Sequence, residues 1–243
     1  MKLLIDVGNT RIKYAFDNKG QLSEVKYLEK DDLHYLLTQE VLCQIKKVII
    51  AAVGQSIMVE QLVSLFNDVK VPVQMLKSQP SFNGLVNSYA EPEKLGVDRW
   101  LAMLGAKHSF TNKHLLVIDA GTATTVDFIN AEGVHQGGWI LPGLQLMRNA
   151  LYGKTEKVKG DEQAIQSLMF ANNTTLAVNQ GVHAATIGGI KQAINLATGF
   201  AAEQGGELVI VLTGGDAQQI QSLLSVKSRL INALIFIGMQ QYC

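Results

Sequence analysis

The sequence predicts an α/β protein built from two similar halves. Apolar segments of strand length alternate with longer segments whose apolar residues recur at helical spacing. The composition supports a large buried core, because 47% of the 243 residues are hydrophobic and only 17% are charged. An apolar strand pattern that ends in Asp-x-Gly occurs at Asp6 and returns at Asp119. This repeated motif indicates that the two halves share one plan.

The first half begins with a predicted hairpin. Residues 3–5 are consecutively apolar, which is typical of a strand covered on both faces, and residues 11–16 alternate polar and apolar before a turn at 17–20. Pro72 places a short strand over 71–76 at a sheet edge or a strand start. The stretch 78–96, rich in Pro and Gly, predicts a long loop or a short hairpin, and such loops are usually functional. The other expected elements are helices over 30–44, 57–66 and 98–108 and a buried strand over 48–53.

The second half repeats this order of elements. We expect strands over 115–120, 126–129, 138–141 and 208–212, and helices over 144–151, 174–194 and 217–224. The segment 230–239 is apolar throughout, so that its periodicity fits a strand or a helix. The boundary is expected near residues 111–113, which gives an N-terminal domain of residues 1–112 and a C-terminal domain of residues 113–243.

Charge and cysteine content argue against several functions. Lysine plus arginine equals aspartate plus glutamate, at 21 each, so the basic excess of a nucleic-acid-binding surface is missing. Cys43 and Cys243 form no C-x-x-C motif, and the five histidines have no zinc-ligand spacing. No signal peptide is evident, and no apolar run reaches the ~20 residues of a membrane-spanning helix. We therefore expect a soluble, reduced, cytoplasmic protein without membrane or nucleic-acid partners.

The two Asp-x-Gly turns predict a phosphate site. A carboxylate at the end of a central strand can hold a hydrated cation such as Mg²⁺, which prefers carboxylates, water and phosphate oxygens. A glycine two positions later lets backbone N–H groups approach a phosphate closely. A single copy of this motif is most often an ordinary turn, but two copies in equivalent places favour two loops that grip one polyphosphate. Further neutral donors follow the two aspartates at Asn9, Thr10, Thr122, Thr124 and Thr125.

Asp98 and Arg99 lie where the long loop meets the next helix. Asp98 fits a general base that takes a proton from an attacking hydroxyl, but an aspartate before a helical run is also a favoured N-cap. Arg99 offers a bidentate donor for a carboxylate or phosphate, or it is a solvated arginine of a first helical turn. Tyr89, taken alone, is most often a partly buried aromatic residue.

Two glycine-rich segments in the second half have open interpretations. Thr213-Gly-Gly-Asp216 lies between a buried strand and a helix, so it fits the close approach of a flat ring or a phosphate, or a simple turn. The segment from Gly137 to Gly143 is rich in turn residues and would be structural in most proteins.

Together these motifs resemble type III pantothenate kinases, members of the actin-like ATPase and sugar kinase superfamily. The resemblance spans nearly the whole chain, and it is the ordered set of motifs, more than any one of them, that is specific. The segments that carry it are Asp6–Lys13, Gly84–Arg99, Asp119–Asp127, Gly137–Gly143, Asn173–Ala177 with Gly181, and Thr213–Asp216.

The resemblance implies a fold and a set of site residues. The fold is two ribonuclease-H-like domains, each a mixed β-sheet flanked by helices, with ATP in the cleft between them. Asp98 would be the proton acceptor, and Asp119 falls where the family places potassium or ammonium. ATP would be bound by Asp6, Val7, Gly8, Asn9, Thr10, Arg11, Ile12, Lys13 and Thr122, and pantothenate by Tyr89, Gly96, Val97, Asp98, Arg99 and Thr174.

The resemblance also implies partners and shows one local departure. Family members are typically homodimers with the pantothenate pocket near the subunit interface. Arg11 and Lys13 stand where many relatives have apolar residues. Either side chain adds a phosphate contact, or both point outward along an alternating strand.

The function expected from this resemblance is ATP- and Mg²⁺-dependent phosphorylation of pantothenate to 4′-phosphopantothenate, the entry step to coenzyme A. One alternative is a kinase for another small hydroxylated substrate, against which the Gly96-Val-Asp-Arg99 loop argues. Another is a nucleotide-binding regulator without catalysis, since some relatives were first noticed as transcriptional accessory factors. An intact Asp98 and a net charge of zero weigh against this second alternative.

Overall fold

A computed structural model describes residues 1–8, 11–28, 42–54, 57–152 and 165–243. The chain divides into two compact units, which we call the first unit (Met1–Ser109 with Ala233–Cys243) and the second unit (Phe110–Asn232). The sequence-based division assigned all of residues 113–243 to one domain, whereas here the last eleven residues belong to the first unit. The predicted helix over 30–44 lies almost entirely outside the described residues.

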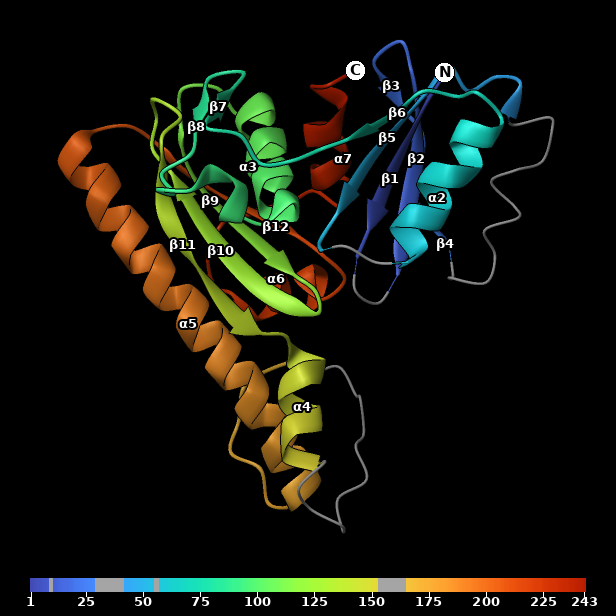
Figure 1. The fold of residues 1–243 in the computed structure, drawn as a ribbon. Helices are drawn as coiled ribbons and strands as arrows, with labels where there is room; N and C mark the ends of the chain where they lie inside the picture. Colours follow the sequence, from blue (N-terminus) through green and yellow to red (C-terminus); the bar gives the residue numbers. More distant parts are fainter. Residues whose placement is uncertain (9–10, 29–41, 55–56, 153–164) are drawn as a thin grey trace. The chain divides into compact units, whose positions relative to one another are not determined.

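The first unit contains a mixed sheet in the order β3-β2-β1-β5-β6, with β4 paired to β2 (Figure 1). Central strand β1 pairs antiparallel with β2, as the predicted hairpin requires, and parallel with β5. β6 lies at the sheet edge, as Pro72 predicted. The strands are β1 (Lys2–Val7), β2 (Ile12–Asn18), β3 (Gln21–Leu22), β4 (Lys26–Leu28), β5 (Lys47–Ala52) and β6 (Val73–Met75).

Helices and a small hairpin complete the first unit. One sheet face packs against helix α2 (Ile57–Asp68), in a core that includes Ile5, Ile50 and Phe66. The stretch 78–96 contains the hairpin of β7 (Ser81–Phe82) and β8 (Leu85–Val86) and the short 3₁₀ helix η2 (Pro92–Lys94). It leads into α3 (Val97–Ser109), which packs along the C-terminal helix α7 (Leu234–Gln240). The segment 230–239 is therefore mostly helical, with one strand residue at its start.

The second unit contains a mixed sheet in the order β11-β10-β9-β12-β13. Its central strand repeats the pairing of β1, since β9 pairs antiparallel with β10 and parallel with β12. The turn-rich segment 137–143 is mostly part of β11. The strands are β9 (His114–Ala120), β10 (Ala123–Ile129), β11 (His135–Pro142), β12 (Leu208–Thr213) and β13 (Arg229–Leu230).

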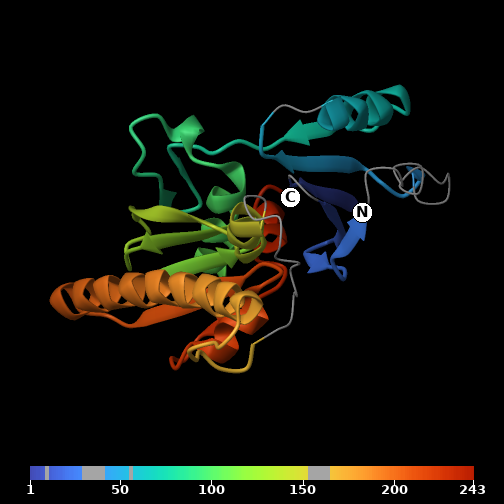
Figure 2. The same ribbon diagram turned by 90° about the horizontal axis from the view of Figure 1, so that it is seen from below.

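Two helices cover the same face of the second sheet. Helices α5 (Thr174–Gln204) and α6 (Ala217–Leu223) share one core with β9, β10 and β12, and Figure 2 shows α5 along that face. α5 begins where the Asn173 side chain accepts a hydrogen bond from the Leu176 N–H at 2.9 Å, which satisfies one of the free donors of a helix start. Its first turns pack against α4 (Leu144–Tyr152). None of the helices in the described ranges has both the length and the apolar character to span a membrane.

Candidate functional site

Asp6 and Asp119 occupy equivalent places in the two sheets. Each stands near the carboxyl end of the central strand of its sheet, in a row with one antiparallel and one parallel neighbour. Asp6 is buried and Asp119 half-buried. A carboxylate in such a position has lost part of its hydration, so it favours a cation or hydrogen-bond donors nearby. The equivalence predicted from the two Asp-x-Gly motifs is therefore present in the structure.

Lys13 and Arg11 have different neighbours in the first sheet. Lys13 lies directly across from Asp6 in the β1–β2 ladder, so both side chains stand on the same sheet face. The guanidinium of Arg11 lies 5.7 Å from the ring centre of Tyr27, a residue of β4, which is a cation–π arrangement. Tyr27 is the direct cross-strand partner of Lys13 in the β2–β4 ladder, so the Arg11–Tyr27 contact lies on the same sheet face as Lys13 and Asp6. Lys13 differs from Arg11 in lying directly opposite Asp6. Asn9 and Thr10 lie outside the described residues.

Three loops of the second unit meet around Asp119. The Gly143 N–H donates to the Thr122 carbonyl at 3.1 Å, and the Asp216 N–H donates to the Ala120 carbonyl at 3.0 Å. These bonds tie the β9–β10 turn to the start of α4 and to the β12–α6 loop. Gly214 has φ +98°, and a Cβ there would run into the Ala120 carbonyl and an Asp119 carboxylate oxygen. Only glycine fits this conformation and this distance, which explains a glycine in the Thr213–Asp216 motif.

Hydroxyl groups stand on both sides of Asp119. Thr125 of β10 and Thr213 of β12 are its direct cross-strand partners, so their side chains share its sheet face. Thr124 points to the opposite face and is buried, and its Oγ1 has no hydrogen-bond partner in the described part of the chain. The donor set around Asp119 is therefore carboxylate, hydroxyl and backbone carbonyl oxygen, which suits hard cations.

A buried polar network lies behind the β12–α6 loop, and no motif in the sequence predicts it. Arg148 of α4 donates from Nε to the Asn179 side-chain oxygen of α5 at 3.2 Å, and both residues are buried. One turn on, His183 Nδ1 donates to the Asn179 carbonyl at 2.7 Å. Burial raises the pKa of Asp216, and the positive charge of Arg148 and the nearby His183 oppose that shift. Charge spacing along a helix does not reveal the Arg148–Asn179 contact, because it joins two different helices.

Tyr89 and Arg99 form a pair in the first unit. Arg99 is buried, and its Nη1 donates to the Tyr89 hydroxyl at 2.9 Å while its guanidinium lies 5.8 Å from the Tyr89 ring centre. The Tyr89 backbone N–H is in turn held by the Asn87 side chain at 3.0 Å. The solvated alternative for Arg99 is therefore excluded, and Tyr89 is half-buried.

Asp98 is the second residue of α3, so the N-cap alternative does not describe it. Its Oδ1 accepts a hydrogen bond from the Arg99 N–H at 2.8 Å, and no other hydrogen bond from the described part of the chain reaches this carboxylate. Gly96 makes room for it, because a Cβ at Gly96 would lie 2.6 Å from Asp98 Oδ1. The half-buried carboxylate can therefore accept a proton or a hydroxyl hydrogen bond.

The structure brings some of the predicted site residues together within a unit. Tyr89 and the run from Gly96 to Arg99 form one cluster in the first unit, and Asp6 and Lys13 share a face of its sheet. Thr122 and Asp119 lie in the three-loop region of the second unit. Thr174 is also in the second unit, exposed at the first turn of α5.

Comparison with known proteins finds one family. Residues 2–196 match the family described as type III pantothenate kinase. A type III pantothenate kinase of Colwellia psychrerythraea is 36% identical over the full length of both chains. One from Idiomarina loihiensis is 34% identical, with 98% of this chain and 97% of the relative covered.

Solved structures show a likeness in fold. A Campylobacter jejuni protein classed with the Baf family of transcriptional activators has a TM-score of 0.63 at 24% identity, covering 98% of this chain and 96% of that one. A Sinorhizobium meliloti protein classed as a 2-dehydro-3-deoxygalactonokinase has a TM-score of 0.58 at 12% identity, covering 99% and 95%. At these identities the likeness concerns the arrangement of sheets and helices.

Proposed function

We propose which residues perform each step of the reaction of this chain. The chain belongs to the type III pantothenate kinase family and phosphorylates pantothenate with ATP and a divalent metal. Phosphoryl transfer through a loose transition state depends mainly on positioning and on charge stabilisation. The proposal therefore assigns residues to three tasks: binding the phosphates, supplying cations, and presenting the pantothenate hydroxyl. The observation that carries it is the Asp98 carboxylate beside the buried Arg99–Tyr89 pair.

Pantothenate binds at Tyr89, Gly96–Arg99 and Thr174 in this proposal. Pantothenate carries a carboxylate, and a buried guanidinium with a neighbouring phenol is a suitable receptor for it. Asp98 orients the primary alcohol and accepts its proton as the bond to the transferred phosphorus forms. Its position in the first turn of α3 stabilises the negative charge it needs before the transfer.

ATP phosphates bind at the loop Asp6–Lys13 and at Thr122. The proposed divalent ion is Mg²⁺, which binds mainly as a complex with ATP. Among the described residues no group of three or more His, Cys, Asp or Glu side chains could hold a metal ion. Mg²⁺ usually keeps several waters and takes few protein ligands, so one carboxylate such as Asp6 fits it.

A monovalent cation binds at Asp119. A carboxylate repels a triphosphate, so a cation near Asp119 reduces that repulsion. The oxygen set described above is compatible with potassium or ammonium, which accept looser coordination than Mg²⁺.

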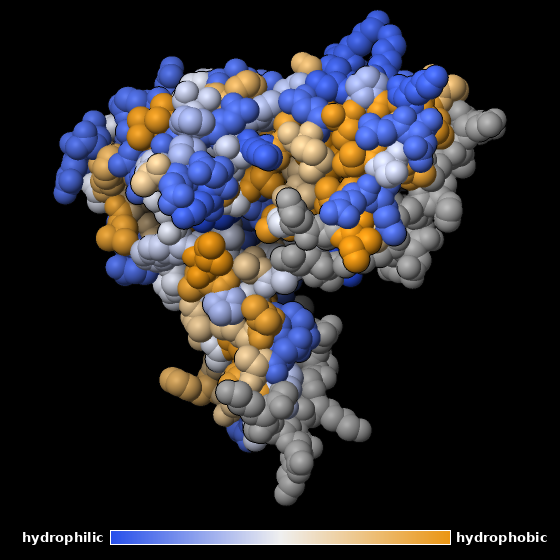
Figure 3. Space-filling view, viewed as in Figure 1, coloured by the Kyte–Doolittle hydropathy of each residue, from blue (hydrophilic) through white to orange (hydrophobic). Residues whose placement is uncertain are grey.

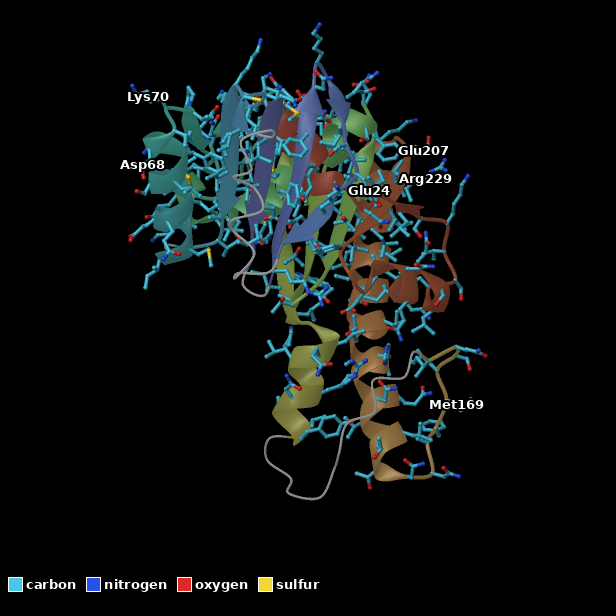
Figure 4. The ribbon with its side chains drawn as sticks, turned by 90° about the vertical axis from the view of Figure 1, so that its right-hand side faces the viewer. Glu24, Asp68, Lys70, Met169, Glu207 and Arg229 are labelled. Atoms are coloured by element: carbon cyan, nitrogen blue, oxygen red, sulfur yellow. The ribbon has the colours of Figure 1, made fainter. Side chains whose placement is uncertain are left out.

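The protein works as a homodimer in the cytoplasm in this proposal. Large apolar side chains are exposed around α4 and the start of α5, and Figure 3 shows hydrophobic surface over this region. Such patches commonly mark interfaces. Met169, labelled in Figure 4, and Phe170 lie in the segment before α5, and Phe170 is fully exposed. Cys43 and Cys243 form no disulfide in the described part of the chain, which supports a reducing compartment.

Replacing Asp98 by Asn tests the base. Asn keeps the volume and an oxygen that can accept from the Arg99 N–H, but it cannot accept a proton. We expect turnover to fall by ~10²–10⁴-fold with little change in thermal stability. Steady-state assays that identify 4′-phosphopantothenate measure this, and the exposed Glu93→Gln, which removes a charge nearby, is the control. An Asp98→Asn enzyme with most of its turnover would exclude Asp98 as the base.

Lys13 and Arg11 can be separated by matched substitutions. Lys13→Met should raise the KM for ATP by about tenfold, because it removes a positive charge from the face of Asp6. Arg11→Met should change the KM for ATP much less, because Arg11 contacts Tyr27. Equal effects of the two substitutions on the KM for ATP would contradict the assignment.

The monovalent cation is tested by salt exchange. At equal ionic strength and saturating Mg·ATP, activity should be high in potassium or ammonium and low in sodium. Asp119→Asn should lose this difference, because the carboxylate that selects the ion is gone. Equal rates of the unchanged enzyme in all three salts would leave only a water-mediated Mg²⁺ contact for Asp119.

The dimer is tested by light scattering on the purified protein at micromolar concentration. We expect a mass of twice 26.5 kDa. Phe170→Glu should shift the mass toward that of the monomer, because burial of a charge in an apolar interface is costly. A monomeric mass for the unchanged protein would contradict the proposed homodimer.

A further inference from the structure

The C-terminal segment returns to the first unit and packs closely against α3. Gly105 of α3 and Gly238 of α7 lie where the two helices touch, and a Cβ on either would run into the backbone of the opposite helix. Backbone contact of this kind requires residues without side chains. Residues after α7 are therefore held in a fixed position beside the first turns of α3.

Tyr242 lies just beyond α7 and makes two side-chain contacts there. Its hydroxyl accepts a hydrogen bond from Trp100 Nε1 at 3.0 Å, and its ring stacks on Phe82 with centroids 4.2 Å apart and planes 5° from parallel. Trp100 is completely buried, so the tyrosine hydroxyl satisfies a donor that would otherwise be costly to bury. Burial raises the pKa of Tyr242, partly offset by the Trp100 hydrogen bond, so the hydroxyl is neutral at physiological pH.

Both contacts of Tyr242 lead to the proposed pantothenate site. Trp100 follows Arg99 directly on α3, and Phe82 belongs to the β7–β8 hairpin. The hairpin is closed by the Asn87 N–H donating to the Pro80 carbonyl at 2.9 Å, and the Asn87 side chain then holds the Tyr89 N–H. Tyr89 is thus linked to the Tyr242 ring through Phe82, the hairpin and Asn87, and Arg99 is linked to it through the neighbouring Trp100.

We propose that Tyr242 is a positioning residue for pantothenate recognition, acting through Phe82 on the loop that carries Tyr89 and through Trp100 on the turn that carries Arg99. This inference rests on the proposed assignment of Tyr89 and Arg99 to pantothenate. In this proposal Tyr242 does not contact the substrate and acts only through Phe82 and Trp100. Substitutions at Tyr242 should therefore weaken the binding of pantothenate more than that of ATP, because the contacts described for Tyr242 do not include Asp6 or Lys13.

A matched control exists at a second anchor of the same segment. The Gln240 side chain donates to the buried Asp17 at 2.7 Å and to the Gly20 carbonyl at 3.2 Å, which ties α7 to the β2–β3 turn. Gln240→Ala therefore loosens the C-terminal segment without touching the hairpin or Trp100. A merely structural role for the segment would make Gln240→Ala and the Tyr242 variants behave alike at equal loss of stability.

Two Tyr242 variants separate the two contacts. Tyr242→Phe keeps the ring on Phe82 and removes the oxygen that accepts from Trp100, whereas Tyr242→Leu removes both. With the full-length enzyme we expect the KM for pantothenate, and its dissociation constant by calorimetry, to rise about threefold in Tyr242→Phe and about tenfold in Tyr242→Leu. The KM for ATP should stay within about twofold, and Gln240→Ala should change neither KM while lowering the melting temperature.

These experiments distinguish the positioning role of Tyr242 from the phosphorylation of pantothenate on which it rests. If the unchanged protein binds and phosphorylates pantothenate but Tyr242→Phe and Tyr242→Leu leave its KM and dissociation constant unaltered, the positioning role is wrong and the function stands. Equal rises in both KM values, or the same pantothenate defect in Gln240→Ala, also overturn it. If Tyr242→Leu does not fold, Tyr242→Phe decides alone. An unchanged protein that neither binds nor phosphorylates pantothenate refutes the function itself.

Discussion

An acidic side chain near the end of the central strand of each sheet is the constraint on which the rest of the structure depends. Such a strand is fixed by hydrogen bonds on both sides, so Asp6 and Asp119 have little freedom to withdraw into solvent. A half-buried carboxylate cannot face a polyphosphate without a cation, because two negative charges in a weakly hydrated place repel strongly. The loops around these aspartates, and the cations that we propose beside them, therefore lie where the strands end. The tight turn at Gly214, which lies against Asp119, is one structural consequence of that arrangement.

The repeated plan of the two halves could be predicted from the sequence, because it depends on local patterns. Consecutive apolar residues marked β1, β5, β9 and β12, and each central strand has the same antiparallel and parallel neighbours. The secondary structure of the segment 230–239 could not be predicted, because a segment that is apolar throughout shows no hydrophobic periodicity. In the structure most of it forms α7 of the first unit, where Gly238 lies in close contact with α3. A contact between residues so far apart in the chain has no local signature.

Only part of the candidate site could likewise be predicted from the sequence. Their motifs made Asp6, Asp98 and Asp119 candidate site residues, but alternation alone could not separate Lys13 from Arg11. That distinction needs the register of β2 against β1 and the position of Tyr27 on β4. The buried state of Arg99 was likewise not visible in the sequence, where an arginine of a first helical turn is most often solvated. Its burial depends on Tyr89, ten positions earlier in an irregular loop, and on the bonds that hold that loop.

The position of Asp98 in the first turn of α3 matters more for its proposed role than its basicity does. An alkoxide is far too basic to be formed in advance by a carboxylate. In a loose transition state the bond to the attacking oxygen is only partly made, so the proton is released late and little basicity is required. What the reaction needs is an ionised carboxylate fixed at one place. The helix start favours the negative charge, and the Arg99 N–H fixes one of its oxygens. The other oxygen is then left to orient the hydroxyl, so that placement of Asp98 contributes more than its strength as a base.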